Sequence, residues 1–219
     1  MDKHEALRQY FGHAAFRYGQ VILVDALIQG RDALGIMPTG AGKSICYQVP
    51  AMIREGITLV ISPLISLMKD QVAALKANGI PAAYLNSSLT ASQMELAMSR
   101  AAAGAYRVIY VAPERLESHS FQQFAQQAKL ALIAVDEAHC VSQWGQDFRP
   151  NYLKIASFIA SLPVRPPVGA FTATATARVK EDIVRYLQLQ QPECITTGFD
   201  RPNLFFDVQQ PKSKFSALQ

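Results

Sequence analysis

Cysteine is scarce in this sequence, and its three residues stand far apart. Cys46, Cys140 and Cys194 form no C-x-x-C pair, so their spacing indicates neither a zinc knuckle nor a disulfide framework. We therefore expect no zinc site and a reducing, intracellular setting. Excess charge is also modest. A formal net charge of +4 suits a polyanionic partner, but such an excess is more often only a solubilising surface.

Long hydrophobic runs are lacking as well. No segment approaches the roughly 20 apolar residues that a membrane-spanning helix needs. The N-terminal stretch MDKHEALRQYFGH has no apolar run of the kind found in signal peptides. We therefore expect a cytoplasmic protein with no membrane partner. Half of the residues are hydrophobic and 17% are charged, which is typical of a globular chain and excludes a disordered one.

Short apolar runs alternate with segments of helical periodicity. The runs predicted to be strands are 32–37, 58–62, 82–86, 107–111, 130–135 and 168–173. The segments predicted to be helices are 64–79, 87–104 and 120–129. Gly79 and Gly104 are stop signals for the first two helices. The alternation predicts an α/β fold with a mostly parallel central sheet and helices on both faces.

The stretch MPTGAGKS, residues 37–44, lies between the first predicted strand and a segment that could continue as a helix. Its glycines let backbone N–H groups converge on phosphate oxygens, and a helix N-terminus adds partial positive charge. Lys43 can reach the β- and γ-phosphates of ATP, and Ser44 can offer its hydroxyl to Mg²⁺. The residues expected to bind ATP here are Pro38, Thr39, Gly40, Ala41, Gly42, Lys43 and Ser44. The alternative is a turn that merely ends in a lysine, since Met37 stands where the strict G-x-x-x-x-G-K-[ST] pattern has glycine.

An acidic pair closes the predicted strand 130–135. Asp136 is expected to hold the magnesium shell, together with Ser44, and Glu137 to orient and deprotonate the attacking water. The expected catalytic residues are thus Lys43, Asp136 and Glu137. The alternative is a surface turn that caps a helix, in which Asp-Glu is common. Because α/β proteins bind ligands at the carboxyl ends of their strands, the two motifs together favour a nucleotide site.

With both motifs in place, nearly the whole chain resembles the first motor domain of RecQ-family DNA helicases, members of helicase superfamily two. The further segments that carry the resemblance are FGHAAFRYGQ, SPLISLMKDQV, YVAPERL, CVSQWGQDFRPNY, FTATAT and FDRPNL, in the family's order. The family's form of the phosphate loop also lacks the first glycine, which accounts for Met37. The resemblance implies a RecA-like P-loop NTPase domain that uses ATP and Mg²⁺.

The resemblance also implies roles for residues that look ordinary by themselves. Gln20, with Arg17 nearby, is expected to read adenine, although both would otherwise be taken for helix-surface residues. The segment DEAH, residues 136–139, is followed by CVSQWGQDFRPNY, an aromatic-rich loop that contains Trp144, Phe148 and Arg149. This aromatic loop is expected to hold single-stranded or partly duplex DNA. The alternative is that Trp144 and Phe148 are core residues. The residues expected to bind DNA or to couple its binding to hydrolysis are Ser62, His139, Gln143, Trp144, Phe148, Arg149, Thr172 and Thr174.

A division of the chain follows from the same resemblance. Residues 1–205 are expected to form the first RecA-like domain, and residues 206–219 to begin a linker to a second one that this chain lacks. The implied parent function is ATP-dependent 3′-to-5′ unwinding of DNA in recombination and repair. Because the second domain brings the arginine finger, we expect the chain alone to be weak or inactive. The alternative is a non-enzymatic regulatory module that binds nucleotide or DNA.

Overall fold

The computed structural model describes residues 1–198. The segment FDRPNL and the expected linker 206–219 lie outside these residues, so the domain boundary at residue 205 stays a prediction. Within the described part, no helix combines the length and the apolar character needed to cross a membrane. Cys46 and Cys140 are buried, Cys194 is half-buried, and all three are free thiols.

Seven strands form one sheet in the order β3-β4-β2-β5-β6-β1-β7, and every neighbouring pair is parallel. The strands are β1 (Ala33–Ile36), β2 (Ile57–Ile61), β3 (Ala82–Leu85), β4 (Val108–Val111), β5 (Leu130–Val135), β6 (Val168–Thr172) and β7 (Glu193–Thr196). The first six confirm the predicted strands. The seventh was not predicted, because an edge strand is half-exposed and ECIT is no continuous apolar run.

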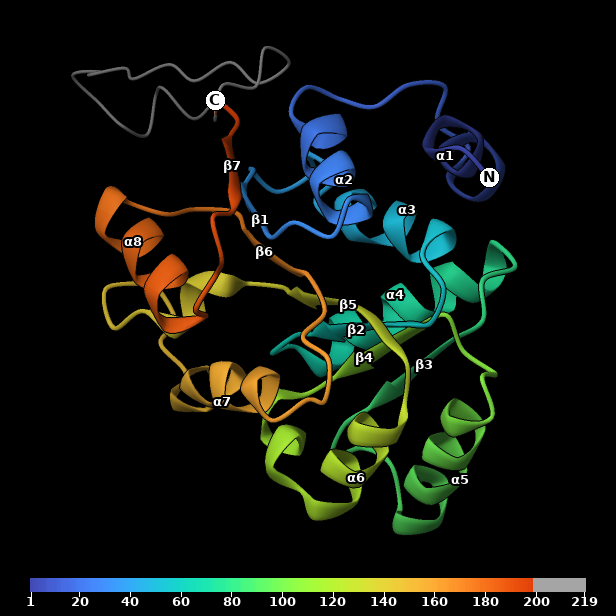
Figure 1. Ribbon diagram of the computed structural model, residues 1–219. Helices are drawn as coiled ribbons and strands as arrows, with labels where there is room; N and C mark the ends of the chain where they lie inside the picture. The colour runs from blue at the N-terminus through green and yellow to red at the C-terminus, as the bar shows by residue number, and fades with distance from the viewer. Residues whose placement is uncertain (199–219) are drawn as a thin grey trace, which may run out of the picture.

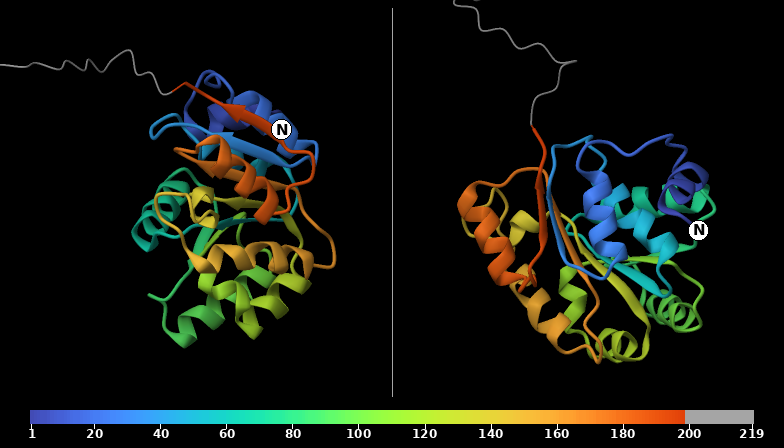
Figure 2. Two further views of the ribbon diagram at one scale, coloured as in Figure 1. Left: turned by 90° about the vertical axis from the view of Figure 1, so that its left-hand side faces the viewer. Right: turned by 45° about the horizontal axis from the view of Figure 1, so that its top comes forward.

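Eight α-helices cover the sheet in residues 1–198. They are α1 (Lys3–Phe11), α2 (Gln20–Ile28), α3 (Ile45–Ile53), α4 (Ile65–Ala77), α5 (Ala91–Ala102), α6 (His119–Gln127), α7 (Ile155–Ala160) and α8 (Ala177–Tyr186). Buried side chains of α1–α4 pack on one face, and those of α5–α8 on the other. Figures 1 and 2 show α2 and α8 on opposite sides of β7. The predicted α/β fold with helices on both faces is confirmed.

The three predicted helices are confirmed as α4, α5 and α6, with shorter bounds. Helix α5 begins at Ala91 because Thr90 and Gln93 form a capping box, each side chain bonding the other's backbone N–H. Gly79 and Gly104 follow α4 and α5 with φ of 75° and 77°. This left-handed conformation ends a helix and favours glycine.

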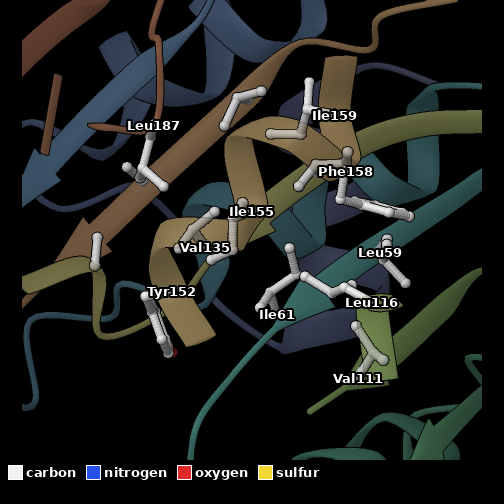
Figure 3. Close-up of a cluster of buried hydrophobic side chains, with 14 of the residues drawn as sticks. Leu59, Ile61, Val111, Leu116, Val135, Tyr152, Ile155, Phe158, Ile159 and Leu187 are labelled. Carbon is white, nitrogen blue, oxygen red and sulfur yellow. The ribbon is translucent and has the colours of Figure 1, made fainter. Parts of the chain in front are cut away.

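One half of the core lies between the sheet and helices α5–α8. In the close-up of Figure 3, Ile61 of β2 and Val135 of β5 lie beside Ile155 of α7, all of them almost fully buried. Tyr152, just before α7, is also fully buried, and its hydroxyl donates to the backbone carbonyl of Asp136 at 2.9 Å. The core therefore fixes the chain where the acidic pair leaves the sheet.

A buried carboxylate anchors the amino ends of β1 and β6, opposite the ends where the acidic pair and the phosphate loop lie. Asp32, directly before β1, is 2% exposed. It accepts hydrogen bonds from both terminal nitrogens of Arg165, at 3.0 and 2.6 Å. It also accepts from the backbone N–H groups of Val168 and Gln190, at 2.8 and 2.7 Å. These bonds hold the start of β1 against the start of β6 and the segment after α8.

We predict that Asp32→Asn destabilises the protein by about 3–5 kcal/mol, because it leaves the Arg165 guanidinium without its carboxylate partner. Urea unfolding at neutral pH measures the change. Glu55→Gln is the matched control: its partner Lys129 and Glu55 itself are both exposed, so the unfolding midpoint should not move. An Asp32→Asn midpoint equal to that of the wild type would contradict the prediction.

Candidate nucleotide site and the adjoining aromatic loop

The loop 37–44 connects β1 to the N-terminus of α3. Gly40 and Gly42 both have φ of 82°, a conformation that side chains rarely adopt. A Cβ atom on Gly42 would lie 2.5 Å from the Gln20 amide nitrogen. Any residue other than glycine would therefore clash with Gln20 at this position. The Lys43 ammonium donates to the carbonyl of Met37 at 3.1 Å, which curls the side chain back over the loop.

Gln20 and Arg17 support this loop by hydrogen bonds to its backbone carbonyls. Gln20 is the first residue of α2 and is 3% exposed, so the alternative of an ordinary helix-surface residue is wrong for it. Its amide nitrogen donates to the carbonyls of Ala41 and Gly42, both at 3.1 Å. Its amide oxygen accepts from the Arg17 backbone N–H at 2.7 Å. The exposed Arg17 guanidinium donates to the carbonyl of Gly40.

These bonds bear on the expected reading of adenine. Both amide hydrogens of Gln20 are already used by the loop, while its oxygen keeps one free lone pair. Gln20 can therefore accept from the amino group of adenine as it stands. Donating to the ring as well would require one of its loop bonds to break. Its adenine contact stays a prediction, now with this restriction.

The phosphate loop and the acidic pair line one cavity of about 380 Å³. The expected site residues that line it are Arg17, Gln20, Thr39, Gly40, Gly42, Lys43, Ser44, Asp136 and Glu137. Pro38 and Ala41 are not among the lining residues. Five lining residues were not expected: His13, Ala15, Ile45, Leu67 and Gln71. Leu67 and Gln71 stand four apart on α4, and this spacing puts them on one helix face.

The acidic pair leaves β5 at the same edge of the sheet. Asp136 is 7% exposed, and its carboxylate accepts from the Glu137 N–H at 3.1 Å. Glu137 has φ of 48° and precedes the short 3₁₀-helix η2 (Ala138–Val141), but its side chain caps no N–H group. The alternative of a surface turn that caps a helix is therefore wrong.

The two neighbouring carboxyl groups have opposite pKa shifts. Burial, reinforced by the charge of Glu137, raises the pKa of Asp136 to about 6. A hydrogen bond with His139 lowers the pKa of Glu137, against the effect of its own burial. Nδ1 of His139 lies 3.2 Å from the Glu137 carboxylate. Paired carboxyl groups with separated pKa values are a recurring feature of acid–base sites.

His139 connects the acidic pair to the end of β6. Its Nδ1 also lies 2.8 Å from the Thr172 hydroxyl, and that hydroxyl donates to the carbonyl of Thr174 at 3.1 Å. Because the Thr172 proton is used in this way, we infer that Nδ1 carries the imidazole proton and is shared between Thr172 and Glu137. Three of the residues expected to act in coupling are thus one connected group.

The aromatic-rich loop follows η2. Trp144 is 62% exposed, so the alternative that it is a core residue is wrong. Phe148 is half-buried, and Gln143 is exposed. The backbone N–H of Trp144 donates to the Ser142 hydroxyl at 3.1 Å. This loop borders a second cavity, of about 240 Å³, whose lining includes His139 and Thr174.

Ser62 and Arg149 were expected to contact DNA, but in the structure each is engaged within the protein. Ser62 is fully buried (0% exposed); its hydroxyl makes no hydrogen bond of good geometry among residues 1–198, but it lies close enough to the Asp136 carboxyl to lower the pKa of that group. It follows β2, and its chain runs beside Asp136, whose N–H bonds the Ile61 carbonyl at 2.8 Å. Its hydroxyl therefore cannot reach a strand in this conformation. Arg149 is ion-paired with Asp147 at 2.8 Å and also donates to the Pro63 carbonyl.

A magnesium ion fits the residues of the larger cavity. Ser44 and Asp136 both line it, and both supply the hard oxygen ligands that Mg²⁺ takes. Within residues 1–198 no cluster of three or more acidic, histidine or cysteine side chains could hold a metal. Mg²⁺ bound with a nucleotide usually takes only one or two carboxylates, with phosphate oxygens and water completing its shell.

The fold and these two motifs define a nucleotide-binding helicase domain. Residues 17–183 match the DEAD/DEAH box helicase family, and the chain belongs to that family. The expected RecQ resemblance is confirmed too. The chain is 48% identical over 204 residues to the ATP-dependent DNA helicase RecQ of Pasteurella multocida, covering 93% of this chain and 32% of that protein.

Other relatives agree. RecQ of Bacillus subtilis is 47% identical over 95% of this chain and 35% of its own length. The bifunctional 3′-5′ exonuclease/ATP-dependent helicase WRN of mouse is 42% identical over 92% of this chain and 14% of its own. The chain thus spans about a third of the length of these two RecQ proteins.

Solved structures support the fold. The DUF1998 helicase MrfA, in a complex with DNA, superposes with a TM-score of 0.71 at 17% identity, over 90% of this chain and 29% of that one. A hypothetical ATP-dependent RNA helicase from Sulfolobus tokodaii gives 0.68 at 19% identity, over 89% and 56%. At such identities these likenesses concern the fold alone.

We predict that Asp136→Asn stabilises the metal-free protein at pH 7.5 by about 1–3 kcal/mol. The folded-state pKa of about 6 lies above the ordinary 3.8, so burying the carboxylate opposes folding at neutral pH. That cost disappears between about pH 7 and pH 4, and the advantage of the variant should shrink with it. Urea unfolding in EDTA across this range measures the effect. The surface substitution Asp70→Asn should change neither the midpoint nor its pH dependence, and a pH-independent gain in Asp136→Asn would refute the burial argument.

Proposed function

We propose that this chain is the ATP- and DNA-binding motor domain of an ATP-dependent, 3′-to-5′ DNA helicase of the RecQ type. One observation carries the proposal: the phosphate loop and the acidic pair line a single cavity, and His139 connects that cavity to the exposed aromatic loop. The parent protein of this proposal is cytoplasmic, nucleoid-associated if bacterial, and takes part in recombination and repair.

The cavity residues have complementary roles in this proposal. Lys43 and the N–H groups of the phosphate loop hold the β- and γ-phosphates. Ser44 and Asp136 hold Mg²⁺, which neutralises phosphate charge when bound. Glu137, whose pKa is lowered, remains ionised at neutral pH and can accept a proton from water. Arg17 and the Gln20 oxygen face the adenine end.

DNA is proposed to bind along the aromatic loop. The Trp144 ring can stack on an unpaired base without regard to sequence, and Arg149 can meet a phosphate once its pair with Asp147 opens. The connected group of His139, Thr172 and Thr174 lies between this loop and Glu137. A movement of the loop would change the position of the Glu137 carboxylate. Ser62 is best placed to hold Asp136 rather than DNA.

A second RecA-like domain is the proposed partner that completes the site. Among the described residues that line the cavity, Arg17 is the one arginine, and its guanidinium bonds the Gly40 carbonyl. An arginine supplied to the transferring phosphoryl group is worth about 10³–10⁵ in rate. We therefore expect the 219-residue chain to bind ATP, to turn it over poorly and to unwind nothing.

We predict that Lys43→Ala weakens binding of Mg²⁺–ATP by the chain about 10- to 100-fold, the usual effect of losing a hydrogen bond to a charged group. Titration calorimetry measures the affinity. Lys76→Ala, an exposed lysine at the end of α4, is the matched control and should bind like the wild type. Equal affinity in Lys43→Ala would mean that the loop is a plain turn.

We predict that Glu137→Gln keeps nucleotide affinity but lowers ATP turnover by about 10²–10⁴, because the amide cannot accept the proton of water. Turnover is measured with and without an oligo-dT strand. This experiment also separates the two functions considered. In a non-enzymatic module the wild type shows no turnover above that of Glu137→Gln. Fast DNA-stimulated turnover by the wild-type chain would instead contradict the proposed need for a second domain.

A further inference from the structure

Helix α8 holds the aromatic loop by two side chains one turn apart. The guanidinium carbon of Arg178 lies 3.8 Å from the centre of the Trp144 ring, a cation–π stack. Asp182 accepts a hydrogen bond from the Ser142 hydroxyl at 2.6 Å. The segment 138–149 (yellow) lies beside α8 (orange) in Figure 1.

The Asp182 contact fixes the backbone of the loop. Ser142 is fully buried, and its hydroxyl also accepts from the N–H of Trp144 at 3.1 Å. Gly145 follows at a point where a Cβ atom would lie 2.4 Å from the His139 carbonyl. Little freedom therefore remains in the backbone from which the Trp144 side chain projects.

The Arg178 contact is of another kind. Its side chain is exposed and makes no ion pair among residues 1–198. An exposed cation–π stack is weak, whereas stacking of a base on an aromatic ring is usually stronger. A base can therefore displace the guanidinium from the ring, but the free energy of the cation–π stack is subtracted from the free energy of base stacking.

We propose that Arg178 is a positioning residue that covers the face of Trp144 in the DNA-free protein and gives that face up to a nucleobase. This inference rests on the proposed contact between DNA and the aromatic loop. It adds a competitor for the stacking face that neither the motifs nor the family match assigns. Without DNA, Arg178 covers the ring face that is turned toward it, and a strand that offers no base cannot replace it there.

The closed stack can be tested without DNA. Trp144 is the single tryptophan of the 219-residue chain, so intrinsic fluorescence reports on it alone. Quenching by acrylamide should rise in Arg178→Ala, because the covered face becomes accessible. Arg185→Ala is the matched control: it removes the same charge from α8, but Arg185 lies over Tyr186 and should leave quenching unchanged. Equal quenching in wild type and Arg178→Ala overturns the proposal.

The replacement of Arg178 by a nucleobase on the Trp144 ring, called the exchange below, is tested with two oligomers of equal length, oligo-dT and its abasic counterpart. Removing Arg178 changes the phosphate attraction of both strands alike, so the ratio of their dissociation constants isolates stacking of the base. In Arg178→Ala this preference for oligo-dT should rise about two- to fivefold, the size of an exposed cation–π stack. Arg185→Ala should keep the wild-type ratio, and Trp144→Ala should abolish the preference.

The outcomes are distinguishable. An unchanged ratio in Arg178→Ala, with both oligomers bound, overturns the exchange while leaving the proposed DNA contact intact. If neither oligomer binds the wild type, the DNA contact itself fails and the exchange with it, whatever the quenching shows. Thermal unfolding of Arg178→Ala should match that of the wild type, since alanine suits an exposed helix position.

Discussion

The parallel pairing of β5, β6 and β1 is the constraint on which the rest of this structure depends. Parallel strands end at one edge, so the phosphate loop after β1, Thr172 at the end of β6 and the acidic pair after β5 lie together there. The pairing is held from the far edge by Asp32, which ties β1 to β6. Core packing and the site are thus parts of one arrangement.

The site stores unfavourable electrostatics that the fold must support. Asp136 is buried beside a second carboxylate, and both effects raise its pKa. The Tyr152 hydroxyl and the β2 backbone hold its main chain in place. The positive charge of Lys43 offsets only part of this effect, and a cation bound in the cavity would supply further counter-charge to the carboxylate. The carboxylate that is proposed to hold Mg²⁺, that of Asp136, therefore lowers the stability of the fold at neutral pH.

Two polar side chains link the cavity lined by the phosphate loop to the aromatic loop. His139 contacts both Glu137 and Thr172, and Ser142, three residues on, is bonded to Asp182 of α8. The aromatic loop is therefore held by α8 through Asp182, and the imidazole of His139 connects it to Glu137. Such a loop can pass a displacement on, because its backbone has few other positions to adopt.

The sequence by itself determined the six buried strands, because parallel strands covered on both faces must be continuous apolar runs. It also predicted that the phosphate loop and the acidic pair follow two strands of the sheet and meet in one site, and the structure confirms this placement. Only the tertiary structure decided that Ser62 is buried, that Gln20 spends its amide hydrogens on the loop, and that Arg178 covers Trp144. The edge strand β7 belongs with these. Each depends on which distant segments meet in space, and no local pattern of residues encodes such a meeting.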